Sequence, residues 1–109
     1  DLRAGVAQRI RADFAQIDRL IGDPTCTCLG AGAPTVLDIY VCVCLRWAQL
    51  YPNGYSQGWV EPQSYPNLIS LAARLEIHPA VIKAQLAEGL GQTPFTAPIH
   101  ANPPIGSAT

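Results

Sequence analysis

The stretch PTVLDIYVCVCLRWAQL, residues 34–50, decides the fold because nearly every position from Val36 to Leu45 is apolar. Neither the two-residue period of a half-exposed strand nor the single stripe of a surface helix describes this run. A membrane-spanning helix needs about 20 apolar residues, whereas Arg46 closes the run much earlier and Asp38 interrupts it. The stretch therefore predicts a buried element that other parts of the chain surround, and no membrane segment.

The N-terminal edge of this stretch distinguishes a helix from a strand. Thr35 is followed three residues later by Asp38, which is the spacing of a capping box. In such a box the Thr35 hydroxyl accepts from the Asp38 N–H, and the Asp38 carboxylate accepts from the Thr35 N–H. A carboxylate at this position also interacts favourably with the helix dipole. We therefore predict a helix over residues 35–51, buried on nearly all sides, in which Asp38 is structural and not catalytic.

The segments on either side of this helix differ in character. Residues 2–21 place larger apolar side chains at intervals of three and four, with charged residues between them. This pattern predicts an amphipathic helix, and Gly22 and Pro24 mark its end. Residues 51–66 combine proline and glycine with aromatic residues, which predicts a long loop.

Two shorter helices are predicted after this loop. Pro66 is suited to the first turn of a helix, and an apolar face continues from there to His78. Pro79 opens another helix, and Gly89 stands where a left-handed C-cap would end it.

The domain organisation follows from these elements. Residues 1–90 are predicted to form one all-α domain, a bundle of about four helices. Residues 91–109 are rich in proline and small side chains and show no periodicity. We interpret them as a Pro-rich tail that is an extended arm or disordered.

The composition limits the classes of partner. Of the residues, 49% are hydrophobic and 14% charged, against about 25% charged in typical soluble domains. We therefore expect part of the surface to be covered by a partner. A net charge of −1 gives no electrostatic reason to expect nucleic acid or an anionic membrane. The N-terminus lacks a signal pattern, so we expect a cytoplasmic protein.

Four segments resemble a known family in order and spacing. They match the helix that precedes the buried helix, the buried helix itself, the aromatic-Pro-x-Leu start of the next helix, and the closing helix. The family is the C-terminal all-helical domain of bacterial-type glutathione S-transferases, and the resemblance covers about residues 3–90. The segments are FAQIDRLIGDP with Leu29-Gly30, TVLDIY with LRW (35–47), YPNL (65–68), and HPAV with EGL (78–90).

The resemblance implies a role in a larger enzyme. In the family, a thioredoxin-like N-terminal domain builds most of the glutathione site and supplies the catalytic residue. We expect that domain, and the first helix of the helical domain, to be missing from these residues. Leu37 also stands where the family usually has alanine. The chain alone is therefore expected to be inactive, with glutathione as co-substrate of the complete enzyme, and it has no resident cofactor.

Three aromatic residues are candidates for the pocket of the second substrate. The resemblance implies that Tyr40, Trp47 and Tyr51 face the cleft that binds an apolar electrophile. The alternative is that Trp47 packs under the following loop while Arg46 caps the C-terminal end of its own helix. No nucleophile and base stand at a spacing that suggests catalysis.

The four cysteines raise the question of a metal. Cys42 and Cys44 would point about 200° apart on a helix, so they cannot share an ion, and we predict no metal site. They are interpreted as small buried hydrophobic residues. A disulfide between Cys26 and Cys28 would close a small, strained ring, yet a reactive thiol at either position stays an open hypothesis.

Three functional hypotheses follow. The first is the helical part of a glutathione S-transferase, which supplies the apolar wall of the co-substrate pocket and pairs with a thioredoxin-like domain or a second copy of the chain. The second is a stand-alone, non-catalytic helical module for protein interaction. The third is a four-cysteine metal or redox protein.

Overall fold

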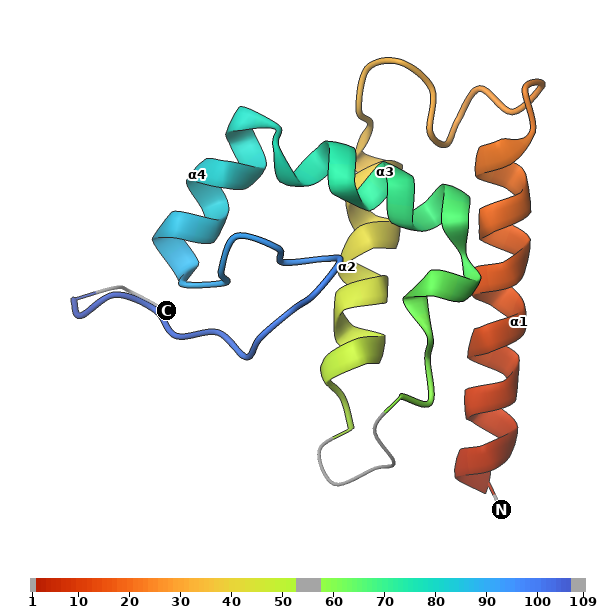
Figure 1. Cartoon of the computed structure of the whole chain (residues 1–109), viewed down its shortest axis with the longest axis horizontal. Coiled ribbons are helices and arrows are strands. Elements are labelled where there is room, and N and C mark those ends of the chain that lie inside the picture. The colour runs from red at the N-terminus through yellow and green to blue at the C-terminus, as the bar shows by residue number, and fades with distance from the viewer. Residues whose placement is uncertain (1, 53–57, 107–109) are drawn as a thin grey trace.

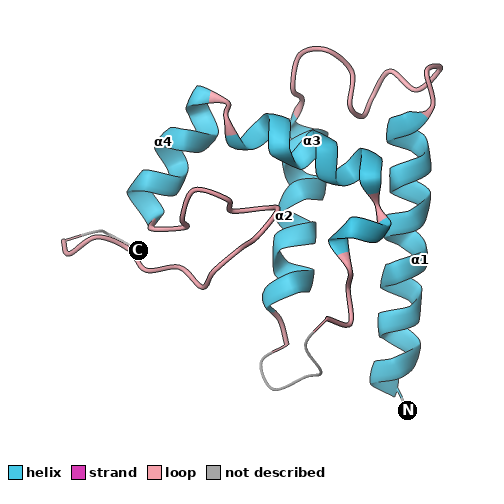
Figure 2. Ribbon diagram, in the orientation of Figure 1, coloured by secondary structure: helices cyan, strands magenta, loops and turns pink. Residues whose placement is uncertain are grey.

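The computed structural model describes residues 2–52 and 58–106 of the 109-residue chain. Within these residues the regular structure consists of helices and no strands, so the predicted all-α class is confirmed (Figures 1 and 2). The elements are α1 (Leu2–Gly22), α2 (Val36–Leu50), the 3-10 turn η1 (Pro62–Ser64), α3 (Pro66–Glu76) and α4 (Pro79–Glu88). The predicted ranges agree with these helices to within two residues at each end. No described helix is both long and apolar enough to cross a membrane.

The helices form a flat bundle. Figure 1 shows α1 and α2 running in opposite directions, with α3 crossing them. α3 contacts α1, α2 and α4. The molecule measures 41 × 39 × 19 Å, and since a helix with its side chains is about 10–12 Å across, the short dimension holds about two layers of helices.

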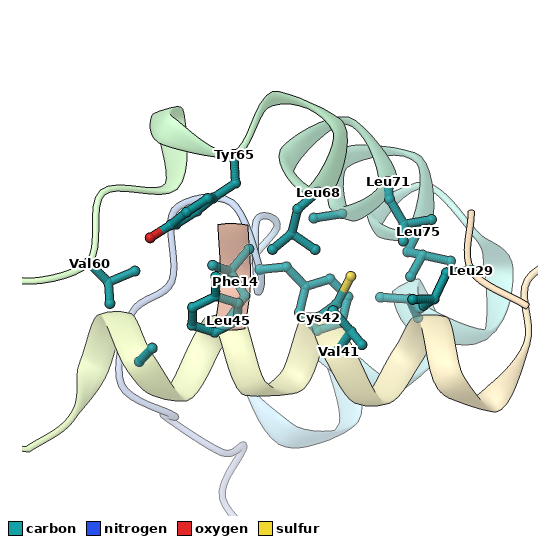
Figure 3. Packing of buried hydrophobic residues seen from close by; sticks show 14 residues of the cluster. Phe14, Leu29, Val41, Cys42, Leu45, Val60, Tyr65, Leu68, Leu71 and Leu75 are labelled. Atoms are coloured by element: carbon teal, nitrogen blue, oxygen red, sulfur yellow. The ribbon is translucent and has the colours of Figure 1, made fainter. Parts of the chain in front are cut away.

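The core lies between α2 and α3, closed on one side by α1. α3 buries Leu68, Leu71 and Leu75 on one face, at the spacing of one helical stripe. Figure 3 shows Leu68 beside Leu45 of α2 and Phe14 of α1, with Leu71 and Leu75 further along the cluster near Leu29. Leu45 and Leu68 are completely buried, and burying each such side chain contributes roughly 1.5–3 kcal/mol.

The prediction that α2 is buried on nearly all sides is wrong. One face of α2 is buried, but the other exposes Val36, Leu37, Tyr40 and Trp47, and Tyr51 just beyond the helix is exposed on the same side. The thinness of the molecule explains the difference. With only about two layers of helices, α2 has a helix layer against one face and no described helix against the other. Apolar content alone did not reveal which positions lack a neighbour.

The predicted capping box is confirmed. The Thr35 Oγ accepts from the Asp38 N–H at 3.3 Å, and Asp38 Oδ2 accepts from the Thr35 N–H at 2.8 Å. The other carboxylate oxygen of Asp38 accepts from the Gly30 N–H at 2.8 Å. Asp38 therefore caps α2 and also fixes the loop that leads into it. The predicted C-cap is confirmed as well, because Gly89 has a left-handed φ of 65°.

The start of α3 is capped from a different helix. Asp18 of α1 accepts from the N–H groups of Asn67 and Leu68 at 2.8 and 2.9 Å. These are free N–H groups of the first turn of α3, and a carboxylate there is also favoured by the helix dipole. The contact joins α1 to α3 near the end of α1.

The segment after α4 is fastened to the bundle, so the interpretation of residues 91–109 as a free arm does not hold for residues 93–99. Phe95 is buried in the core. The Glu76 carboxylate accepts from the N–H groups of Phe95 and Thr96 at 2.9 and 3.0 Å, and from the Thr96 hydroxyl at 2.8 Å. A single side chain at the end of α3 thus satisfies three donors of this segment.

Arg46 completes this attachment and does not cap its own helix. Its guanidinium donates to the carbonyl oxygens of Pro94 at 3.1 Å and Ile99 at 2.8 Å. Gln49, one turn further along α2, donates to the Phe95 carbonyl at 2.7 Å. The suggested capping role is therefore wrong, because partners remote in sequence use the guanidinium instead.

Candidate apolar binding groove

A groove opens between α1 and α2, with a cavity volume of about 770 Å³. Pockets for small molecules commonly have volumes of about 300–1,000 Å³. The lining is mainly apolar, and its only charged residues among those described are Arg3 and Asp13. The lining residues are Leu2, Arg3, Val6, Ala7, Ile10, Asp13, Phe14, Ile17, Cys44, Trp47, Ala48, Tyr51, Pro52 and Trp59.

The α1 side of the groove is the N-terminal half of the stripe predicted for residues 2–21. Leu2, Val6 and Ile10 are four residues apart and therefore share one face of the helix. Leu2 is 85% exposed, although the same stripe reaches the buried Phe14 further along. The stripe is thus covered at Phe14, in the middle of α1, and uncovered at its N-terminal end.

The α2 side is formed by its exposed face. Cys44, Trp47 and Tyr51 are three and four residues apart, so they follow one another along that face. Ala48 lies between this face and the core and is buried at the bottom of the groove. Two apolar helix faces therefore line one groove, and no described helix lies between them.

The loop after α2 closes one end of the groove. The Trp59 indole N–H donates to the Tyr51 carbonyl at 3.3 Å, and Arg11 donates to the Trp59 carbonyl at 3.0 Å. These bonds join the far end of the loop to the end of α2 and to the middle of α1. The sequence pattern also predicts that Tyr55 anchors this loop, but Tyr55 lies outside the described residues. The Trp59 ring thereby becomes part of the wall.

The three predicted aromatic residues are only partly brought together. Trp47 and Tyr51 line the groove, whereas Tyr40 lies outside it on the exposed surface of α2. The Tyr51 ring also meets the His100 ring edge to face, with centroids 5.5 Å apart. Tyr51 therefore stands between the groove and the segment after α4.

Sequence analysis did not identify the α1 half of the groove. Leu2, Val6 and Ile10 belong to the predicted apolar face but were not assigned to a binding site. Cys44 was expected to be buried and is instead half-buried at the groove wall. Only the relative position of two helices reveals such a site, and the sequence pattern of either helix alone does not contain it.

The groove is equipped for binding more than for chemistry. Its one thiol is Cys44, and burial raises the pKa of that thiol, so it is protonated at neutral pH. The described lining contains no histidine, serine or lysine. Asp38 is almost completely buried and its oxygens accept from backbone N–H groups, which supports its structural role.

The other three cysteines are a single core residue and a pair in a loop. Cys42 is buried in the core, and burial raises its pKa to about 12. Cys26 and Cys28 lie in the loop between α1 and α2 with their sulfur atoms 3.5 Å apart. Across the described parts of the chain, no three histidine, cysteine or acidic side chains are grouped to hold a metal ion.

Comparison with known proteins adds no relative. No family model, no curated protein and no solved structure matches the chain.

Proposed function

We propose that this chain is the helical part of a glutathione S-transferase-like enzyme, in which the α1–α2 groove binds the apolar portion of an electrophilic co-substrate. The observation that carries the proposal is the groove itself, with its 770 Å³ volume and mainly apolar lining. The capping box of α2, which the resemblance places at the heart of the family's helical domain, gives further support.

The role of the groove in such an enzyme follows from its chemistry. Trp47, Tyr51 and Trp59 offer large, rigid aromatic surfaces against which a flat apolar molecule can stack. A thioredoxin-like domain, or a second copy of the chain, would complete the site and hold glutathione. The reaction would be attack of the glutathione thiolate on the electrophile, and the groove would contribute by holding the electrophile close to the sulfur. The proposal includes a cytoplasmic location.

One observation favours the second hypothesis, a non-catalytic interaction module. The exposed apolar residues of α2 continue beyond the groove through Tyr40 and Leu37 to Val36. A small molecule in the groove would leave these residues in water, whereas a partner helix laid along α2 would cover them. The two hypotheses therefore differ in how much of the α2 surface is used.

Calorimetric titrations with glutathione and with S-hexylglutathione test the proposal. The hexyl chain provides the apolar group, and we expect it to bind the isolated chain where glutathione alone does not. Trp47→Ala should weaken this binding at least about fivefold, because it removes a large apolar contact. Leu86→Ala is the matched control, since Leu86 is exposed and apolar but lies on α4, away from the groove.

Two outcomes would contradict the proposal. One is that S-hexylglutathione does not bind, and the other is that it binds equally to the Trp47→Ala and wild-type chains.

Light scattering at rising concentration tests the second hypothesis with the same samples. Self-association that Tyr40→Ser abolishes, with binding of S-hexylglutathione absent, would favour the interaction module.

A further inference from the structure

The loop between α1 and α2 holds two thiols next to each other. Cys26 and Cys28 have sulfur atoms 3.5 Å apart, within hydrogen-bonding distance for sulfur. Cys26 is half-buried and Cys28 is exposed, so molecules in solution can reach this pair. Only Thr27 separates the two cysteines, which keeps the second thiol close to whatever reacts with the first.

The loop that carries these thiols is fixed at both ends. On the α1 side, the Asp23 carboxylate accepts from the N–H of Thr25 at 2.9 Å and from its hydroxyl at 2.7 Å. On the α2 side, Leu29 is buried in the core and Gly30 donates to Asp38. The dithiol is therefore presented by a turn whose flanks are ordered by side chains, and its two sulfur atoms are held in proximity.

The two thiols have different electrostatic surroundings. The backbone N–H of Cys28, the Cys28 thiol and the backbone N–H of Leu29 all donate to the Cys26 sulfur, and they lower the pKa of Cys26. The pKa of Cys28 is raised, because its proton is held by the Cys26 sulfur and a second negative charge beside the first is unfavourable. The carboxylates of Asp23 and Asp38 act against ionisation of Cys26 and Cys28 respectively, but less strongly.

We propose that Cys26 and Cys28 form a dithiol site for thiol–disulfide exchange with a small-molecule disulfide such as glutathione disulfide. Cys26 is the attacking thiol and Cys28 is the resolving thiol. The site is separate from the α1–α2 groove, since neither cysteine lines the groove. The proposal therefore does not depend on the function proposed for the groove.

The reaction has two balanced steps. The Cys26 thiolate attacks one sulfur of glutathione disulfide, forms a mixed disulfide and releases one glutathione thiolate, which takes a proton from water. Cys28 then loses its proton and attacks the Cys26 sulfur, which forms the Cys26–Cys28 disulfide and releases the second glutathione thiolate. The chain is oxidised by two electrons, and one glutathione disulfide is reduced to two glutathione molecules. The small ring makes the product easily reduced, so excess glutathione should reverse the reaction.

Mass spectrometry after acid quenching tests this proposal. The reduced wild-type chain is mixed with glutathione disulfide, and the modified cysteines are located by peptide mapping. We expect the chain to lose two hydrogens and to carry a disulfide between residues 26 and 28. Adding excess glutathione should restore the dithiol. In Cys28→Ser the reaction should stop at a stable glutathione adduct on Cys26. In Cys26→Ser the reaction should be about tenfold slower, because the more ionised thiol has been removed.

Thr27→Ala is the matched control, since it alters the same loop without removing a thiol and should keep the wild-type reaction rate. Alkylation of the wild-type chain by iodoacetamide gives a measurement that needs no variant, and Cys26 should be labelled before Cys28 and Cys44. The proposal is overturned if wild type forms neither the disulfide nor an adduct on Cys26, or if Cys28 is labelled first. Binding of S-hexylglutathione in the groove should be the same in Cys26→Ser and wild type, so failure of either proposal is seen separately.

Discussion

Each face of α2 contains residues whose burial does not follow from their hydropathy. The buried face contains Asp38 and Arg46, which are 1% and 8% exposed, whereas the open face contains Tyr40 and Trp47, which are 63% and 55% exposed. The charged residues are buried because each has backbone partners on segments that pack against α2. The comparison teaches that in so thin a molecule the available partners, as well as hydropathy, decide which side chains are covered.

Of the substitutions at the two buried charged residues, removing the carboxylate should give the larger effect. Asp38→Ala leaves the N–H groups of Thr35 and Gly30 without their acceptor and removes the charge at the start of α2. We expect a loss of about 3 kcal/mol in the free energy of unfolding, measured by urea denaturation. Thr35→Ala, which removes one capping bond, should cost about 1 kcal/mol. An equal loss in the two variants would show that Asp38 acts only as a cap and not as the anchor of the preceding loop.

Removing the buried guanidinium should have the smaller effect of the two. Arg46→Ala takes away the donors to the Pro94 and Ile99 carbonyls, for a loss of about 2 kcal/mol. Amide hydrogen exchange should become faster at Phe95 and Thr96, because the segment after α4 loses one of its attachments. Arg74→Ala is the control, since Arg74 is exposed on α3. Unchanged exchange at these amides would mean that Glu76 and Gln49 suffice to hold the segment.

Alkaline pH should weaken the buried face of α2. Burial raises the pKa of Cys42 from 9.0 to about 12, so the folded chain holds this proton more tightly than the unfolded chain. The contribution to stability is complete below pH 9 and is lost as the pH rises toward 12. Tyr65, whose pKa burial also raises, acts in the same direction.

Urea denaturation at several pH values measures this effect. Cys42→Ala should cost about 1 kcal/mol at neutral pH, where it removes a small buried side chain. It should also make the decline in stability above pH 9 less steep than in wild type. Identical pH profiles for the two chains would show that Cys42 does not contribute to alkaline unfolding.

Truncation on the open face should have the smallest effect on stability. Trp47→Ala should change the free energy of unfolding by less than about 0.5 kcal/mol, as exposed substitutions usually do. Leu45→Ala, two positions earlier on the buried face, should cost about 2–5 kcal/mol. Thermal melts of the two variants give the contrast directly. A large loss for Trp47→Ala would show that the groove wall supports the fold and is not reserved for a ligand.

The sequence is sufficient to predict the features that depend on nearby residues. The Thr35 and Asp38 pair, Pro66 at the start of a helix and Gly89 at the end of one are each determined within a few positions of the chain. For that reason the helices and their order could be predicted. The fold class followed from them, because strands had no place in the pattern.

The groove and the attachment of residues 93–99 to the bundle could not be predicted, because they depend on residues far apart in the chain. Asp38 reaches Gly30, and Arg46 reaches Pro94 and Ile99, but no spacing rule connects these positions. Likewise, an apolar stripe predicts that a face can be buried, but it does not show whether a neighbour is there to cover it. Trp47 was accordingly left with two interpretations, and the structure places it in the groove wall.

The attachment of Arg46 has a consequence for the order in which the chain folds during synthesis. Its carbonyl partners are added to the growing chain 48 and 53 residues after Arg46 itself. At about 5–20 residues per second, the ribosome needs roughly 3–10 s to supply them. Until then no carbonyl oxygen can replace the water molecules that hydrogen-bond to the guanidinium. Docking the C-terminal half of α2 on α3 therefore costs the free energy of desolvating Arg46. The stretch of residues 94–99 therefore controls when α2 reaches its final position.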